Sequence, residues 1–186
     1  DGAFNWTVPD DITATATVKV RVRSWTDLDA LDDSDNAFKI KGDYTISSPV
    51  LNDPFKIYHA TQNPVTHPIT WTTIGGAGGT MGTVNLIAYS TTPLDPYFRD
   101  ALNDGYTLAS PLTIVNGYLN TPNASTTYSW QVPDKASPTI VVRVVNPADT
   151  TVFKDSPVFK IQGALTVTYP NAVNTVLVVN NPETIT

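Results

Sequence analysis

Trp130-Gln131-Val132-Pro133-Asp134 has an earlier counterpart in the same chain, Trp6-Thr7-Val8-Pro9-Asp10. Each copy is followed by a valine-rich run, an acidic loop and a Phe-Lys-Ile motif, which stands at residues 38–40 and again at 159–161. The spacing between the copies drifts only from 130 − 6 = 124 to 159 − 38 = 121 residues. Repetition at a fixed period is the sequence signature of a repeat array. We therefore expect tandem domain-sized repeats.

The repeat divides the chain into three parts. Residues 1–42 match the C-terminal half of a repeat, residues 43–163 form one complete repeat, and residues 164–186 match the N-terminal part of a following one. The first part, residues 1–42, lies near the lower limit of about 40 residues below which chains rarely fold unaided. Two interpretations stay open: a fragment of a longer chain, or head-to-tail strand exchange in which residues 164–186 of one molecule complete residues 1–42 of another.

The composition predicts an acidic all-β chain. Of 186 residues, 41% are hydrophobic and 15% are charged, and 15 Pro and 10 Gly separate the apolar runs as turn residues would. The net charge of −6 and the pI of about 4.6 argue against nucleic acid and anionic membranes as partners, because both recruit clustered Lys and Arg. No apolar run is long enough to span a bilayer, so we expect no membrane insertion. Zero Cys excludes disulfides and fits a bacterial or archaeal surface protein.

Alternation of apolar and polar residues predicts short strands throughout the chain. Residues 69–74 place Ile69, Trp71 and Thr73 on one face, and residues 83–90 are typical of a central strand. Residues 93–123 are expected to be irregular, with one helical turn at 97–102. Further strands are expected at residues 4–8, 15–25, 37–41, 44–46, 54–58, 140–145, 165–170 and 176–179, and next to Trp130. About seven short strands per 100 residues is the expectation for an immunoglobulin-like sandwich, with Trp6 and Trp130 as core aromatics.

The repeat unit also resembles a known group of proteins. The similarity rests on Ile-Thr-Trp at 69–71, Val-Asn-Leu-Ile-Ala-Tyr-Ser at 84–90, Tyr-Ser-Trp-Gln-Val-Pro-Asp at 128–134, and Phe-Lys-Ile at 159–161. These motifs resemble the immunoglobulin-like repeats of large microbial cell-surface proteins, a group related to a Ser/Thr-rich surface domain. The resemblance implies β-sandwiches carried in tandem on an exported adhesin, stalk or S-layer protein. An S-layer protein of the kind that coats anammox bacteria is the preferred interpretation.

The most distinctive chemical feature is an acidic stretch at residues 27–36. It carries five carboxylates, which repel one another unless they are solvated or bridged by a cation. Ca²⁺ takes six to eight oxygen ligands in flexible geometry, so a calcium site is one interpretation and a solvated turn the other. The stretch lacks the glycine and the closing glutamate of an EF-hand loop. The candidate ligands are Asp27, Asp29, Asp32, Asp33 and Asp35.

Enzymatic interpretations find little support in the sequence. Neither His59 nor His67 has a nucleophile nearby, and both are expected to be turn or surface residues. The loop at 75–79 lacks the Lys-Ser/Thr that follows the glycines of a phosphate-binding loop. Glu183 is the only glutamate, so acid and base groups would have to be Asp. We expect a protein that is not an enzyme.

Two further features point to contact surfaces. Val141 and Val145 stand where the first copy has Lys19 and Arg23, so the second copy's strand is apolar on both faces. Such a strand is covered by another element, here by residues 93–123 or a neighbouring domain, or it is an intermolecular contact. N-glycosylation sequons begin at Asn5 and Asn123, and the many Thr and Ser offer sites for O-glycans.

The sequence thus favours a structural, self-assembling component of an extracellular coat such as an S-layer. Its expected partner is another copy of itself, in head-to-tail or lattice contact, with Ca²⁺ as a candidate cofactor. The alternative is a carbohydrate-binding or adhesive module that uses Trp25, Trp71, Tyr97 or Tyr106 to stack on cell-surface glycans.

Overall fold

The structure is a computed structural model that describes residues 2–10, 12, 17–59, 65–76, 80–92, 95, 112–163, 169–170, 177, 179, 182 and 184–185. All regular secondary structure in this part of the chain is β, which confirms the predicted all-β class. The strands are β1 (Arg21–Arg23), β2 (Leu31–Asp33), β3 (Asp43–Ser48), β4 (Pro54–Lys56), β5 (His67–Ile74), β6 (Thr83–Ser90), β7 (Leu112–Leu119), β8 (Ser125–Trp130), β9 (Ser137–Asn146), β10 (Asp149–Asp155) and β11 (Phe159–Gln162).

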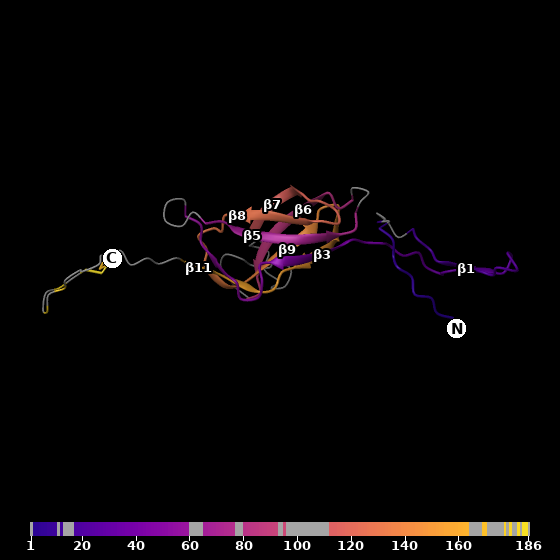
Figure 1. Ribbon diagram of the computed structural model, residues 1–186, viewed down its shortest axis with the longest axis horizontal. Coiled ribbons are helices and arrows are strands. Elements are labelled where there is room, and N and C mark those ends of the chain that lie inside the picture. Colours follow the sequence, from indigo (N-terminus) through magenta and orange to yellow (C-terminus); the bar gives the residue numbers. More distant parts are fainter. Residues whose placement is uncertain are drawn as a thin grey trace.

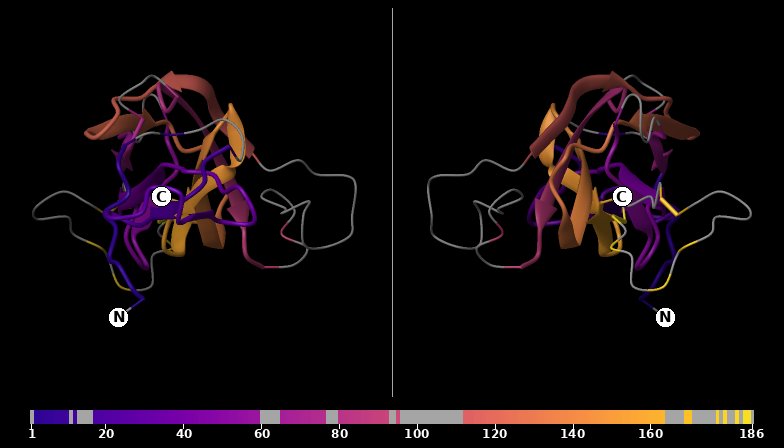
Figure 2. Two further views of the ribbon diagram at one scale, coloured as in Figure 1. Left: turned by 90° about the vertical axis from the view of Figure 1, so that its right-hand side faces the viewer. Right: turned by 90° about the vertical axis from the view of Figure 1, so that its left-hand side faces the viewer.

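Two sheets form the body of the molecule, residues 43–163, which we call the sandwich. The larger sheet runs β4-β11-β9-β6-β7, with β10 paired to β9, and the smaller sheet runs β3-β5-β8. β4 and β11 are parallel, and the other neighbouring strands in both sheets are antiparallel. The sheets lie as two layers in the ribbon views (Figures 1 and 2).

The core fills the space between these layers. The smaller sheet contributes the fully buried side chains of Tyr44, Ile69 and Trp71, and the larger sheet contributes valine, leucine and isoleucine from β6, β9 and β11. Burying one such aliphatic or aromatic side chain contributes roughly 1.5–3 kcal/mol. The core therefore joins the two sheets into one unit and fixes the positions of the loops at their ends.

β5 and β6 agree with the sequence pattern. Ile69, Trp71 and Thr73 all point inward from β5, each at most 1% exposed, as period-two alternation predicts. β6 covers the expected residues and pairs with β7 on one side and β9 on the other. The prediction of a central strand at residues 83–90 is therefore confirmed.

β7 corrects the prediction that residues 93–123 are irregular. Ile114 and Val115 are adjacent and both half-buried, and Asn116 and Gly117 are both exposed, so side chains do not alternate regularly. The register with β6 shifts twice along the pair. An irregular strand of this kind has no clean period-two signal, which is why the sequence pattern missed it. The helical turn expected at 97–102 lies outside the described residues.

Residues 2–42, which we call the N-terminal arm, form less regular structure than expected. Of the strand predicted at 15–25, the described residues 17–25 contain only β1, and the strand predicted at 37–41 is reduced to a bridge between Val18 and Phe38. Within the described residues, β1 pairs with β2 alone. A two-stranded hairpin is only marginally stable in water, so short pairing is what such an isolated segment sustains.

The hairpin of β1 and β2 nevertheless repeats the pairing of β9 and β10. Arg21 pairs with Asp33, and Arg143 pairs with Asp155, at a common offset of 122 residues (143 − 21 and 155 − 33). Each guanidinium donates two hydrogen bonds to its carboxylate, at 2.6 and 2.8 Å in the arm and at 2.7 and 2.8 Å in the sandwich. Bidentate pairing of this kind fixes geometry as well as charge.

Backbone hydrogen bonds repeat at the same offset. The amide of Ser34 donates to the carbonyl of Val20 at 2.8 Å, and the amide of Ser156 donates to the carbonyl of Val142 at 2.8 Å. The bridge between Val18 and Phe38 likewise corresponds to the pairing of Ile140 with Phe159. The arm and the β9-β10-β11 region of the sandwich thus share one local structure.

The two copies differ in what covers them. Val20 and Val22 of the arm are 46% and 71% exposed, whereas their counterparts Val142 and Val144 are fully buried. β9 lies between β6 and β11 and faces the smaller sheet, while the described residues around β1 supply no second sheet. The same residues in the same register therefore lie open in the arm and covered in the sandwich.

Trp6 shows the same difference and corrects a prediction. Its counterpart Trp130 is 4% exposed and contacts Phe55 with ring centroids 6.3 Å apart, as expected of a core aromatic. Trp6 is 47% exposed and contacts only the edge of Phe38 among the described aromatic rings. The prediction that Trp6 is a core residue is wrong, because the described residues of the arm supply no second sheet with a neighbour like Phe55.

The arm and the last strand lie toward opposite ends of the molecule. β1 projects away from the sandwich along the long axis, and β11 lies at the other end of the sandwich (Figure 1). End-on views show the two sheets of the sandwich directly (Figure 2). A surface at the arm end and a surface at the β11 end therefore do not compete for space within one molecule.

Candidate functional site

The five carboxylates of the predicted calcium site all lie in the hairpin of the arm. Asp32 and Asp33 are neighbours in β2, so their side chains point to opposite faces of the strand. Asp33 forms an ion pair with Arg21, whose two hydrogen bonds to it lower the pKa of the Asp33 carboxyl. The carboxylate of Asp27 accepts the amide of Asp29 at 3.2 Å within the turn. Asp35 follows β2 and is exposed.

This arrangement does not bring the five side chains together. Within the described residues, no group of three His, Cys, Asp or Glu side chains is placed to hold a metal ion. Ca²⁺ requires six or more oxygen ligands, so binding here would require the turn to rearrange or a second molecule to add ligands. Calcium binding by the acidic hairpin stays a prediction.

The aromatic residues predicted to stack on glycans differ in their exposure to solvent. Trp71 is fully buried in the core, so the prediction that it forms a surface platform for glycans is wrong. Trp25 is 95% exposed at the turn of the hairpin and presents its ring to solvent. Tyr97 and Tyr106 lie outside the described residues. Only Trp25 of this set is shown as an exposed ring.

An open groove runs between the edge strands of the two sheets. β7 ends the larger sheet and β8 ends the smaller one, and the groove between them has a volume of about 510 Å³. Tyr128 contributes an aromatic wall, and its ring meets Tyr118 edge-on at 5.1 Å between centroids. No sequence pattern predicted this groove, because one of its walls is the irregular strand β7. Its lining residues are Leu112, Thr113, Ile114, Tyr128, Ser129, Trp130, Gln131 and Pro133.

The doubly apolar strand predicted at 140–145 is the inner strand β9. Val141 is 3% exposed and Val145 is half-buried, which agrees with cover by another element. Asp95, from the segment expected to supply this cover, accepts a hydrogen bond from the hydroxyl of Ser137 at 2.5 Å. Most of residues 93–111 lie outside the described part of the chain.

His67 is more than the surface residue that the sequence predicts. Its Nε2 accepts the backbone amide of Lys56 at 2.9 Å, and its ring stacks on Phe55 with centroids 4.3 Å apart. Burial lowers the pKa of His67, with nearby Lys56 adding to the decrease and Asp53 opposing it. The neutral imidazole is therefore the form that ties β4 to the start of β5.

The depressed pKa of His67 predicts a loss of stability in acid. The unfolded chain protonates this residue near pH 6.5 and the folded chain at a lower pH, so the unfolded state binds more protons as pH falls below about 6.5. The free energy of unfolding should therefore decrease with pH below that value. His67→Gln keeps an acceptor but cannot titrate, so urea unfolding from pH 7.5 to 5 should show a flatter profile. His59→Gln is the matched control and should retain the dependence; equal slopes in the parent and His67→Gln would contradict this role.

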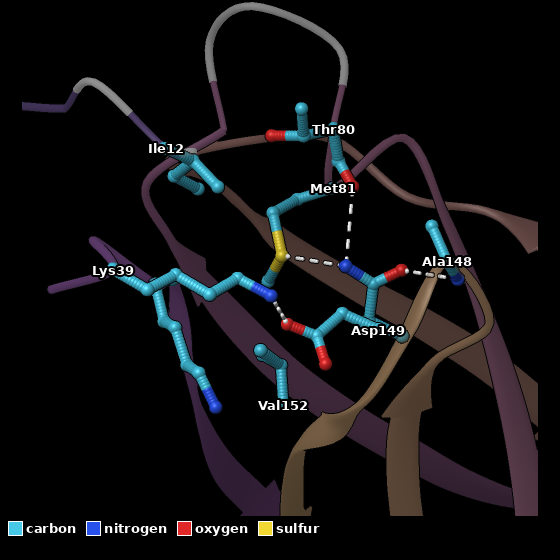
Figure 3. A pocket seen from close by; sticks show the side chains of 10 residues that line it. Ile12, Lys39, Thr80, Met81, Ala148, Asp149 and Val152 are labelled. Atoms are coloured by element: carbon cyan, nitrogen blue, oxygen red, sulfur yellow. Dashed lines mark hydrogen bonds and ion pairs between the residues drawn. The ribbon is translucent and has the colours of Figure 1, made fainter. Parts of the chain in front are cut away.

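A small cavity of about 110 Å³ lies where the arm joins the sandwich (Figure 3). Ile12 and Lys39 line it from the arm, and Met81, Asp149 and Val152 line it from the sandwich. The Nζ of Lys39 contacts the carboxylate of Asp149 at 2.5 Å, with both side chains about one-fifth exposed. The mixed apolar and ionic lining suits a joint between two parts of the chain.

No protein-family model matches the chain, and no curated protein matches it. Among the described residues, no helix has the length and apolar character needed to cross a membrane.

Proposed function

We propose that this chain is part of a non-enzymatic structural protein made of tandem immunoglobulin-like sandwiches that assembles on the cell surface into an S-layer or similar coat. One observation carries the proposal: the same hairpin is present twice, covered in the sandwich and open in the arm. Counterpart valines in the two copies are fully buried and 71% exposed. Residues 1–42 are then the C-terminal half of one repeat, and residues 164–186 are the start of another.

The strand order supports the immunoglobulin-like assignment. Such folds pack two mainly antiparallel sheets, one smaller and one larger, over a core of alternating inward residues. Here a sheet of β3, β5 and β8 faces a sheet built around β11, β9, β6 and β7. Trp130 lies in the core between them, next to Phe55. This is the arrangement that the repeat motifs imply.

The open face of the arm supports assembly as the function. Val20 and Val22 lie on the same side of the strand and are 46% and 71% exposed, and burying an apolar side chain of this size contributes roughly 1.5–3 kcal/mol. An exposed strand edge also offers unpaired backbone groups to a partner strand. Between separate molecules, the partner is residues 164–186 of another copy, an apolar segment with Glu183 as its only charged residue.

The acidic, Ser- and Thr-rich, cysteine-free composition supports an extracellular location. Carboxylates in the hairpin offer ligands for Ca²⁺ at a contact between copies, where a second molecule completes the oxygen shell. Surface glycans on Thr and Ser fit the same setting. No reacting group is required for this role.

Self-association is the expected result that tests the proposal. Light scattering should show a mean mass that rises above the 20.1 kDa of one chain as concentration increases, and rises further with Ca²⁺ than with a chelator. Val22→Asp places a charge on the open face and should abolish the association. Val65→Asp is the matched control, because Val65 is 52% exposed but lies outside the arm.

A mass that stays at one chain over the whole series would contradict assembly by this face. It would favour the second candidate, an adhesive module, which the 95% exposure of Trp25 supports. Glycan-array binding that depends on Trp25 would then identify the ligand class. The two functions thus predict opposite behaviour in solution.

A further inference from the structure

Asp10 fastens the arm to the end of the sandwich. Its Oδ1 accepts a hydrogen bond from the backbone amide of Gly76 at 2.6 Å, and its Oδ2 accepts one from the Nδ2 of Asn123 at 2.8 Å. Asn123 in turn accepts the amide of Gly75 through its Oδ1 at 2.6 Å. One carboxylate, one carboxamide and two successive amides thus form a closed set of three hydrogen bonds, in which each acceptor meets a donor.

The receiving turn is shaped for this contact. Gly75 and Gly76 have φ values of 86° and 91°, a region that side chains rarely adopt. A Cβ on Gly76 would lie 2.4 Å from the Cβ of Met81, so no other residue fits there without displacing the core. Asn123 also has a positive φ, 54°, which Asn tolerates better than most residues. The turn therefore presents its amides in a conformation that few sequences can adopt.

A second anchor lies at the other end of the arm. Lys39 forms the ion pair with Asp149, and Lys41 donates to the hydroxyl of Thr151 at 2.5 Å. The hydrogen bond from Lys39, helped by Thr151, lowers the pKa of Asp149 to about 2. Figure 3 shows the contact of Lys39 with Asp149. Asp10 precedes the hairpin and Lys39 follows it, so the arm is held on the sandwich on both sides of the hairpin.

We propose that Gly75, Gly76, Asn123 and Asp149 form a docking rim for the end of a preceding repeat, with Asp10 and Lys39 as the two charges that it receives. This inference depends on the proposed tandem-repeat function, because the partner of the docking rim is another copy of the repeat. The contacts themselves are those of the arm in this chain. Joined at two points, neighbouring repeats are held at a fixed angle instead of swinging on a loose linker.

The opposite end of the sandwich carries the same two charges. Asp134 is the counterpart of Asp10, at an offset of 124, and Lys160 is the counterpart of Lys39, at an offset of 121 (134 − 10 and 160 − 39). Both are exposed or partly exposed: Asp134 follows the buried Val132, and Lys160 points outward from β11. This end is therefore the surface that meets the rim of a following repeat.

We call the three hydrogen bonds among Asp10, Asn123 and the amides of Gly75 and Gly76 the clasp. Exchanging the side chains of Asp10 and Asn123 tests it. Asp10→Asn keeps the acceptor for Gly76 but points an NH₂ group at the NH₂ of Asn123, so the second bond is lost. Asn123→Asp faces one carboxylate with another. The double variant Asp10→Asn/Asn123→Asp restores all three bonds with the donor and acceptor exchanged. Hydrogen exchange of the Gly76 amide should be at least about tenfold faster in each single variant and return to the parent rate in the double.

Small-angle X-ray scattering on the same proteins reports the arm. Each single variant should show a broader distribution of distances, and the double variant should recover the parent curve. Asp29→Asn, which removes an exposed carboxylate from the same arm, is the matched control and should change neither measurement. Unchanged Gly76 exchange in Asp10→Asn, or a double variant as loose as the singles, would overturn the clasp, whatever the self-association experiment shows.

The role of Asp134 and Lys160 is tested in a variant whose arm no longer covers the docking rim. Asp10→Ala/Lys39→Ala/Lys41→Ala removes the side-chain bonds that hold the arm on the rim, so the rim is open to Asp134 and Lys160 of a second molecule. NMR signals of Gly75, Gly76 and Asn123 should then shift with protein concentration, and the shifts should disappear when Asp134→Asn/Lys160→Gln is added. Signals that do not move with concentration would overturn this role of Asp134 and Lys160 and leave the clasp of Asp10 intact.

Discussion

Replacing Trp71 with alanine is expected to lower the free energy of unfolding by about 3–5 kcal/mol. The side chain is fully buried between the sheets, and its Nε1 donates to the Oδ1 of Asn120 at 2.8 Å. Its ring also meets Tyr118 edge-on at 6.1 Å between centroids. The substitution removes the largest fully buried side chain of the core and leaves a cavity. Urea unfolding followed by circular dichroism measures the loss.

Trp25→Ala is the matched control for this prediction. Trp25 is 95% exposed, so its removal should change the free energy of unfolding by no more than about 0.5 kcal/mol. Trp71→Phe keeps an aromatic ring and gives up the N–H, so its loss should be smaller than that of alanine. A loss below about 1 kcal/mol for Trp71→Ala would mean that the two sheets do not depend on the core described above.

Asn120→Ala is expected to cost about 2–4 kcal/mol, because it breaks a buried set of hydrogen bonds at once. The Nδ2 of Asn120 donates to the carbonyl of Met81 at 2.6 Å. Its Oδ1 accepts from Trp71 and from the hydroxyl of Thr73, each at 2.8 Å. The residue thus ties the end of β7 to β5 of the smaller sheet and to the segment before β6. Alanine leaves these partners buried without a bond, and thermal or urea unfolding reports the cost.

Two companion variants separate packing from hydrogen bonding. Asn120→Asp keeps the shape and the acceptor but cannot donate to Met81 when ionised, so it should also destabilise and do so more as pH rises. Asn116→Ala changes an exposed residue of the same strand, β7, and should be near neutral. If Asn120→Ala is as mild as Asn116→Ala, the network contributes nothing to holding the sheets together.

In the proposed coat, the contacts of Asp10 and Lys39 determine how stiff the joint between neighbouring repeats is. Stacked sandwiches transmit load only if the joints between them are stiff, and a joint with two charged contacts resists bending at two points. The contacts use a turn with two glycines, Asn123 from the turn between β7 and β8, and Asp149 at the start of β10, so they form only once the sandwich has folded. Docking and folding of each repeat are therefore linked.

Local alternation was enough to predict the strands that lie between neighbours on both sides. β5 and β6 follow the predicted pattern because each has one face turned to the core and the period of a strand is two. The repeat was equally visible in the sequence, since Arg21 and Arg143 occupy matching positions and form matching ion pairs. Strand type and repeat order are local properties, so the sequence alone was sufficient for them.

The candidate sites were harder to predict, because they depend on which distant residues meet. The carboxylates of the acidic hairpin are close in sequence, yet β2 turns Asp32 and Asp33 to opposite faces and Arg21 takes one of them. The clasp joins Asp10 to Gly76 and Asn123, residues 66 and 113 positions away, and no local pattern in the sequence links positions so far apart.

Local patterns along the chain were sufficient for the all-β class, the inward faces of β5 and β6 and the internal repetition. The burial of Trp130 and the half-exposure of Trp6 depend on tertiary packing, because both residues stand in the same sequence motif. A side chain's preference for burial is encoded locally, but burial itself requires neighbours that another part of the chain, or another molecule, supplies. In the sandwich those neighbours are present; around the arm, within the described residues, they are not.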